Sequence, residues 1–144
     1  MKSDFVKCGI LGWCIEIVWT AFHGIKSKNN KFIGYTSIIM FPIYGLASVI
    51  KPISLKLKKM KMPTIIRGIV YSIGIFMVEL ITGSILKKTN NCPWDYSDKK
   101  YNINGVIRID YAPLWCIVGV IFEKMLNSKS VSYTHLTLPT TSRV

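Results

Sequence analysis

The chain has 144 residues, of which 50% are apolar and 18% charged, and its 19 Lys and Arg against 7 Asp and Glu give a formal net charge of +12. A soluble domain of this size usually carries more charge and shorter apolar runs. The basic residues stand mainly between and beside the apolar runs, which favours a membrane protein with basic loops over a nucleic-acid-binding protein.

Four apolar runs approach the roughly 20 residues that a helix needs to cross a bilayer. They cover residues 5–25, 32–50, 64–86 and 107–126. The first run contains Glu16 and lacks a clear small-residue cleavage site, so we expect a retained span rather than a signal peptide. Pro113 suits a first helical turn, so the fourth helix could begin near Asp110. The sequence therefore predicts an all-α, polytopic transmembrane helical bundle of about four spans, forming one membrane domain over residues 1–130.

The distribution of lysines favours one orientation of these spans. Five of them crowd the loop between the second and third runs: Lys51, Lys56, Lys58, Lys59 and Lys61. Basic loops tend to stay in the cytoplasm, and four spans place both termini on the side of this loop. We therefore expect a multi-pass membrane protein whose termini and loop 51–61 are cytoplasmic. The loop could also bind anionic headgroups, but a topology signal is sufficient to explain it.

Small and polar residues form a stripe along the first run. Its members, at helical steps of three or four residues, are Gly9, Gly12, Glu16, Thr20 and His23. Small residues let membrane helices approach closely, and polar ones hydrogen-bond across the contact. Similar stripes occur in the third run (Gly68, Ser72, Glu79 and Gly83) and in the second (Ser37, Gly45 and Ser48). If the three stripes face one another, they build a bundle with a polar interior.

The charged residues of this interior are candidates for a polar path or for a latch between helices. A charge inside a membrane is expensive, so Glu16 and Glu79 should face protein or water. Arg108 and Asp110 would close the end opposite the termini, where His23 also emerges. The glutamates could bind a cation, a proton or a polar substrate in a cavity, or they could only hydrogen-bond across helices. The sequence leaves both interpretations open.

The sequence lacks the motifs of a metal site or a soluble enzyme. Its cysteines, Cys8, Cys14, Cys92 and Cys116, form no C-x-x-C pair and have no histidine at metal spacing, so we expect no disulfide framework, no metal and no cofactor. The patterns G-x-x-x-x-G-K-[ST], G-x-S-x-G and H-E-x-x-H do not occur. We expect that the chain is not an enzyme and that any ATP is bound by another chain.

A polar insert that begins with "CPWDYSDKK" separates the third and fourth runs. Its turn-forming residues and interface aromatics predict an ordered loop on the extracytoplasmic side. Trp94 and Tyr96 could rest at headgroup level, and Asp95 could accept N–H bonds from its own turn. Arg108 could pair with Asp95 or with a neighbouring aspartate, Asp98 or Asp110. These residues predict a cap over the bundle mouth, either a structural one or a movable lid.

Several segments together resemble a known family. They are "GWCIE" (residues 12–16), "FPIYG" (41–45), Glu79 in "GIFMVELITG", and above all "CPWDYS" (92–97) followed by "NINGVIRIDYAPLW" (102–115). The chain resembles the type IV, CmpB-like family of ABC-transporter permeases, small polytopic membrane proteins of low-GC bacteria. The resemblance implies a location in the bacterial cell membrane, and it supplies no catalytic residues.

The last 14 residues, "VSYTHLTLPTTSRV", show no helical or strand period. Residues 131–141 resemble the translated end of a transposase-type sequencing adapter, whose codons match Val131 through Thr140 without a mismatch. We therefore interpret 131–144 as a non-native tail, so a further span could have followed in the natural chain.

The leading prediction is a permease component of a transporter. Its partners would be the lipid bilayer and either a separate ATPase subunit or further copies of itself. The alternative is a structural or regulatory membrane protein without transport activity. A lesser alternative is an intramembrane enzyme that uses Glu16 and Glu79 as acid and base.

Overall fold

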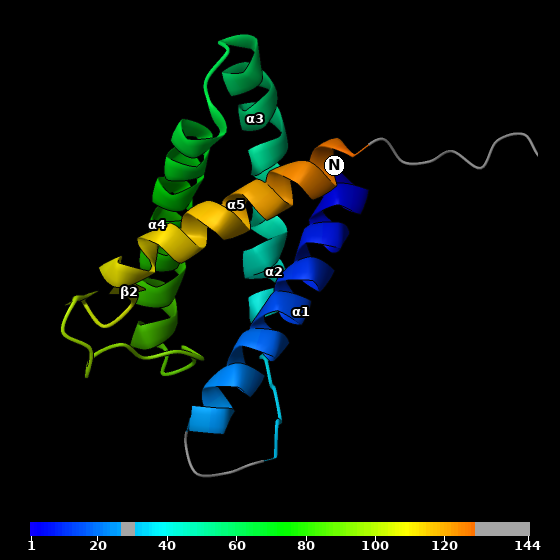
Figure 1. Cartoon of the computed structure of the whole chain (residues 1–144). Coiled ribbons are helices and arrows are strands. Elements are labelled where there is room, and N and C mark those ends of the chain that lie inside the picture. Colours follow the sequence, from blue (N-terminus) through cyan, green and yellow to red (C-terminus); the bar gives the residue numbers. More distant parts are fainter. Residues whose placement is uncertain (27–30, 129–144) are drawn as a thin grey trace, which may run out of the picture.

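The computed structural model describes residues 1–26 and 31–128 of the chain, so the interpretation of the tail at 131–144 lies outside the described residues. The described part is mostly helical, as predicted (Figure 1). Its elements are α1 (Lys2–Lys26), α2 (Met40–Gly45), η1 (Leu46–Val49), α3 (Ile50–Lys59), α4 (Thr64–Lys88), β1 (Asn102–Ile103), β2 (Ile107–Arg108), η2 (Ile109–Tyr111) and α5 (Ala112–Asn127).

The second apolar run folds differently from the predicted helix over 32–50. Helical structure begins at Met40 and continues through α2, η1 and α3 to Lys59, with right-handed helical φ/ψ at each joint. Pro42 explains the start, because a proline N–H is not needed in a first turn but would be missing inside a helix. Pro52 similarly explains the 3-10 turn before it, since it cannot donate a bond back to Ser48.

The helices form two pairs, α1 with the α2–η1–α3 rod and α4 with α5. Glycines allow the close approach within each pair. Gly12 of α1 faces the ring of Tyr44, and Gly119 of α5 faces Tyr71 of α4, so a Cβ at either glycine would collide with the ring. The stripes predicted on the first and third runs therefore serve mainly the contacts within the pairs.

The two pairs meet at the end where the lysine-rich turn lies. The buried cluster there joins α1, α3, α4 and α5 through Cys8, Ile50, Tyr71, Phe122 and Leu126. Figure 1 shows α5 crossing obliquely over the rod toward the N-terminus of α1. Away from this crossing the pairs diverge, and the polar loop after α4 lies at the far end.

The fourth run is α-helical from Ala112 and is preceded by a 3-10 turn from Ile109, so helical structure starts close to the position predicted near Asp110. Residues 107–111, predicted as the start of a span, instead form β2 and the short η2. Pro113 lies in the first turn of α5, as predicted. The 16 residues of α5 extend about 24 Å at ~1.5 Å per residue, which is less than the ~30 Å of a bilayer core.

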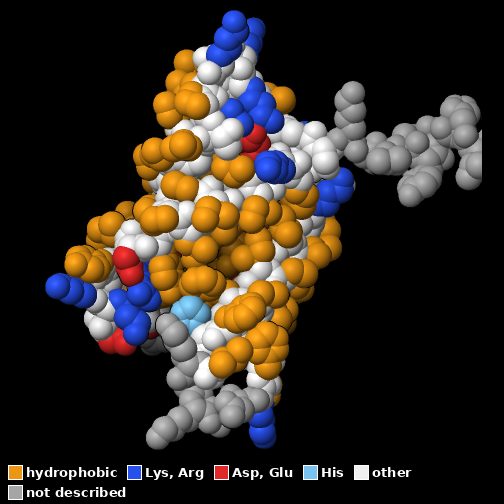
Figure 2. All heavy atoms as spheres, viewed as in Figure 1, with side chains coloured by type: hydrophobic (Ala, Val, Ile, Leu, Met, Phe, Trp, Pro, Cys, Tyr) orange, Lys and Arg blue, Asp and Glu red, His pale blue; other side chains and the backbone are white. Residues whose placement is uncertain are grey.

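Within the described residues, two helices are long and apolar enough to cross a membrane, over Lys2–Ile25 and Thr64–Lys88. On α4 an exposed stripe repeats at every fourth residue, through Ile65, Ile69, Ile73, Met77, Ile81 and Ile85. From Ile65 to Ile85 this stripe is about 30 Å long. An exposed apolar surface of this extent typically marks an interaction surface, such as one with lipid. Figure 2 shows apolar side chains covering most of the visible face.

Candidate functional site

A cavity of about 620 Å³ lies between the two helix pairs. Its walls come from α1, the α2–η1–α3 rod, α4 and α5, and the loop after α4 contributes Pro93, Trp94 and Tyr96. Figure 2 shows the hollow in the middle of the apolar face, above the pale-blue histidine. The volume falls in the range of pockets that hold drug-sized ligands.

Glu16 and Glu79 both line this cavity, from α1 and α4 respectively. Glu16 is anchored by its own pair, because Oε2 accepts a hydrogen bond of 2.8 Å from Thr36 Oγ1. Tyr44 also lies beside the Glu16 carboxylate. The structure thus places two acids that are 63 positions apart in the chain in the lining of one cavity.

Glu79 lacks such an anchor. Its Oε2 is buried and has no hydrogen-bond partner among the described residues, and the same holds for Trp115 Nε1. Trp115 lies beside the Glu79 carboxylate and interacts with it, but neither Trp115 Nε1 nor Glu79 Oε2 makes a hydrogen bond of acceptable geometry with the described residues. A buried polar atom without a partner costs about 1–3 kcal/mol, so these two atoms mark the place where a bound group would gain most.

The loop after α4 closes the cavity with alternate side chains. Trp94 and Tyr96 line it, whereas the side chain of Asp95 is 65% exposed. Trp94 is fixed by a 3.0 Å bond from Nε1 to the Val106 carbonyl, and the Tyr96 N–H donates to the Gly105 carbonyl at 2.8 Å. The predicted cap residues therefore divide between two faces of one extended segment.

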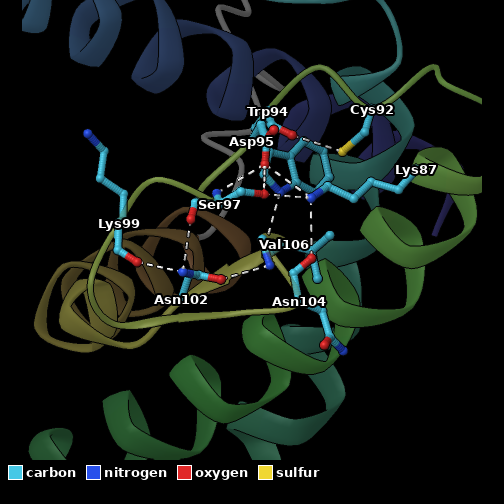
Figure 3. Close-up of polar contacts among 10 residues, drawn as sticks. Lys87, Cys92, Trp94, Asp95, Ser97, Lys99, Asn102, Asn104 and Val106 are labelled. Carbon is cyan, nitrogen blue, oxygen red and sulfur yellow. Dashed lines mark hydrogen bonds and ion pairs between the residues drawn. The ribbon is translucent and has the colours of Figure 1, made fainter.

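Asp95 organises the outer face of this loop (Figure 3). Its Oδ1 accepts bonds from the backbone N–H and the hydroxyl of Ser97, and Lys87 Nζ lies 3.1 Å away. These hydrogen bonds from Ser97 and Lys87 lower the pKa of Asp95 to about 2. Lys87 also donates to the Asn104 carbonyl, so one lysine ties the end of α4 to both halves of the loop. The Ser97 N–H bond agrees with the turn predicted for Asp95.

Arg108 and Asp110 form a pair of their own, outside the cavity lining. Arg108 Nη2 lies 2.8 Å from Asp110 Oδ2, and its guanidinium stacks on the ring of Tyr111 at 4.4 Å. Of the three aspartates considered from the sequence, Asp110 is the partner. His23 lies at the rim of the cavity, in contact with Trp19, which in turn packs edge-on against Tyr111.

Comparison with known proteins places the chain in one family. A family model described as "Putative ABC-transporter type IV" matches residues 4–143. The chain belongs to this family. The matched range includes part of the tail outside the described residues. No solved structure matches the chain.

The segments that carry the family resemblance converge on the cavity. Glu16 comes from "GWCIE", Tyr44 from "FPIYG" and Glu79 from α4. "CPWDYS" supplies Trp94 and Tyr96, and the segment that follows supplies Trp115. Because these segments are far apart in the sequence, the cavity is the feature of this family member that unites them.

A second polar cluster lies at the lysine-rich end, and sequence reasoning found only part of it. Glu123 of α5 is 2% exposed. It pairs with Arg67 of α4 through two bonds of 3.1 Å, with Lys58 of α3 at 2.9 Å, and accepts a bond of 2.7 Å from the Tyr71 hydroxyl. Arg67 and Glu123 stand in the third and fourth runs at positions toward the predicted cytoplasmic side, so the sequence allows them to pair, but it indicates neither Lys58 nor Tyr71.

Three residues of the cavity were also missed. Thr36, Tyr44 and Trp115 bond to or lie beside the glutamates. Tyr44 carried a signal, because it follows Pro42 in the motif "FPIYG" and Gly12 leaves room for its ring. Thr36 carried none, since it lies in a stretch predicted as helix that runs extended beside α1.

Proposed function

We propose that this family member is the membrane-embedded permease component of an ABC-type transporter, with its substrate path through the cavity between the helix pairs. The family description and the two long apolar helices support this proposal. The exposed stripe of α4 supports it further, because its length matches the hydrocarbon core and a water-facing helix would not repeat isoleucine in this way.

The proposal includes four membrane-embedded segments: α1, the α2–η1–α3 rod, α4 and α5. Successive segments run in opposite directions, so the N-terminus, the turn after α3 and the end of α5 lie toward one side (Figure 1). Lys56, Lys59 and Lys61 give that side its positive charge, which favours the cytoplasm. The short α5 is accommodated by its oblique course and by local thinning of the bilayer.

The contrast between two glutamates carries the functional half of the proposal. An acid that only holds helices together should have its oxygens satisfied by neighbours, and Glu123 is such an acid. Glu79 is different, because it lines a cavity and Oε2 has no partner within the described part of the chain. Polar groups kept within a membrane without a structural partner are expected to serve binding or transport.

We propose further that this chain is not itself an enzyme. ATP would bind to a separate subunit, and Glu16 and Glu79 would hold a substrate rather than act as acid and base. The competing reading, a structural or regulatory membrane protein, requires both glutamates to be needed for folding. Under that reading Glu16→Gln and Glu79→Gln would abolish accumulation of the protein in the membrane.

The experiment uses Gly74, which faces open space where a Cβ would meet nothing within 4 Å. Gly74 lines the cavity, so Gly74→Trp fills it without disturbing a packed contact. Met77→Trp, on the exposed stripe of the same helix, is the matched control. The tagged chain is purified from its host membrane and reconstituted in nanodiscs, where bound ATPase and its rate of ATP hydrolysis are measured.

We expect an ATPase subunit to copurify in fixed ratio and Gly74→Trp to change its hydrolysis rate severalfold, because cavity occupancy and hydrolysis are coupled in a transporter. Met77→Trp should leave the rate unchanged. If no ATPase accompanies the chain, or if the two tryptophan variants behave alike, the transporter proposal is wrong.

A further inference from the structure

The fixed charges that line the cavity are acidic. They belong to Glu16 and Glu79; none of the described lining residues is Lys or Arg, and the imidazole of His23 lies at the rim. The basic side chains nearby are neutralised elsewhere: Arg108 by Asp110 and Lys87 by Asp95. A cavity with low-dielectric walls and acids alone concentrates a negative potential and attracts cations.

The walls around the acids are aromatic. Tyr44, Trp94, Tyr96 and Trp115 all line the cavity: Tyr44 comes from α2, Trp94 and Tyr96 from the loop after α4, and Trp115 from α5. Tyr96 packs edge-on against Tyr111 at 5.9 Å, which fixes the orientation of its ring. Aromatic faces attract cations, and cages of such rings are the usual way in which proteins hold quaternary ammonium groups.

The size and donor set argue against an inorganic ion. Mg²⁺ or Ca²⁺ needs about six oxygen ligands, and no group of three or more His, Cys, Asp or Glu side chains suited to a metal occurs within the described ranges. The cavity of about 620 Å³ also has apolar walls, formed for example by Ile75, Val78 and Leu114. This combination fits a molecule with both a cationic centre and an apolar body.

We propose that the cavity binds a hydrophobic organic cation, whose charged centre lies between Glu79 and the aromatic side chains of Trp94, Tyr96 and Trp115. This inference rests on the proposed function and names its substrate class. The cation supplies the partner that Glu79 Oε2 lacks. Glu16, already bonded to Thr36, adds negative charge from the opposite wall.

Charge selectivity is the direct test. The purified full chain in nanodiscs of zwitterionic lipid is equilibrated with tetraphenylphosphonium, and bound probe is measured by equilibrium dialysis after subtraction of empty nanodiscs. Tetraphenylborate has nearly the same size and shape with the opposite charge. We expect saturable binding of the phosphonium and at least tenfold weaker binding of the borate. Equal binding of the two ions, or no saturable binding of the phosphonium, overturns the inference.

Two variants locate the binding. Glu79→Gln should weaken binding of tetraphenylphosphonium at least tenfold, and Gly74→Trp should abolish it by filling the cavity. Asp98→Asn makes the same carboxylate-to-amide change on the exposed loop, where Asp98 pairs only with its neighbour Lys99 in the described structure, and should have no effect. If Glu79→Gln binds as tightly as the wild type, the site assignment is wrong.

The outcome is separable from that of the proposed function. A chain that copurifies with an ATPase and responds to Gly74→Trp but ignores tetraphenylphosphonium remains a transporter with a different substrate class. A chain that binds the cation in the cavity but has no ATPase partner refutes the permease role and keeps the binding site.

Discussion

Removal of the Glu123 carboxylate is expected to destabilise the protein more than any other single change to a charged residue. Glu123→Ala leaves the Arg67 guanidinium, whose side chain is 14% exposed, without its two bonds to a carboxylate. Tyr71, 2% exposed, loses the acceptor of its hydroxyl. Lys58 is 41% exposed and can turn to water. Breaking a buried pair on one side costs about 3–5 kcal/mol, which corresponds to a fall in Tm of about 10 °C or more for a chain of this length.

The assay is thermal unfolding in detergent micelles, followed by tryptophan fluorescence. Asp98→Ala, which removes an exposed carboxylate from the loop, serves as the control and should leave Tm unchanged. A double variant, Arg67→Met with Glu123→Leu, removes both buried charges and should regain most of the lost stability, because apolar pairs of similar volume replace buried ion pairs at little cost. A Glu123→Ala protein that unfolds within about 2 °C of the wild type would refute the reasoning.

Three further predictions concern packing, lipid exposure and the loop. Gly12→Val should cost about 1–3 kcal/mol by overpacking against Tyr44, whereas Gly74→Val, with open space around it, should keep a near-native Tm. Ile73→Lys, midway along the exposed stripe of α4, should make the free energy of membrane insertion less favourable by about 2.5–3.5 kcal/mol. Ile65→Lys, near the end of the stripe, should be tolerated because the lysine side chain can reach the membrane surface. Carbonate extraction of membranes measures the inserted fraction of both variants. The pKa of Asp95 is lowered from 3.8 to about 2, so its stabilising contacts are complete above pH 4 and are lost as the pH falls from about 4 to about 2. The tryptophan fluorescence of the loop should change over that pH range in the wild type and should not do so in Asp95→Asn. A wild-type signal that changes between pH 7 and 5 would contradict this assignment.

The sequence predicted the helical class and the inward position of Glu16 and Glu79, because apolar runs and isolated acids report on burial. Arg108 and Asp110, predicted at the same interior, lie outside the cavity lining, and among the described residues the buried acid is Glu123. It misplaced the start of the second helix, since hydropathy alone cannot distinguish an apolar helix from an apolar segment without regular structure. Pro42 held the missing information. Its position fits a first turn better than a helix centre, and the structure begins the helix two residues before it.

The short hairpin was also predictable and was overlooked. Asn104 and Gly105 both adopt positive φ between Ile103 and Ile107, which pair across the turn. An Asn-Gly pair between apolar residues is a strong hairpin signal. The pairing buries Val106 completely, beneath Gly83 and Trp94.

The composition of the cavity could not be read from helical stripes alone. Those stripes identified Glu16 and Glu79, but the glycines one turn away are packed: Gly12 faces Tyr44, and Gly83 faces Val106 and Trp94. A residue one turn away from a packed glycine can therefore line a cavity between pairs, and only the divergence of the pairs decides which residues do so. No single-sequence pattern encodes that angle.

The uneven distribution of contacts between the two helix pairs sets how the molecule can deform. At the lysine-rich end, Lys58 bonds to Glu123 and Ser54 accepts a bond from Asn127, over a shared apolar cluster. At the loop end, the ring contact of Trp19 with Tyr111 joins α1 to η2. Rotation of one pair against the other thus costs ion pairs and buried surface at one end and mainly ring stacking at the other. The lysine-rich end therefore acts as the hinge between the two helix pairs. A small change of the angle between the pairs gives the largest displacement at the opposite end, at Trp19, Tyr111 and the mouth of the cavity that they border.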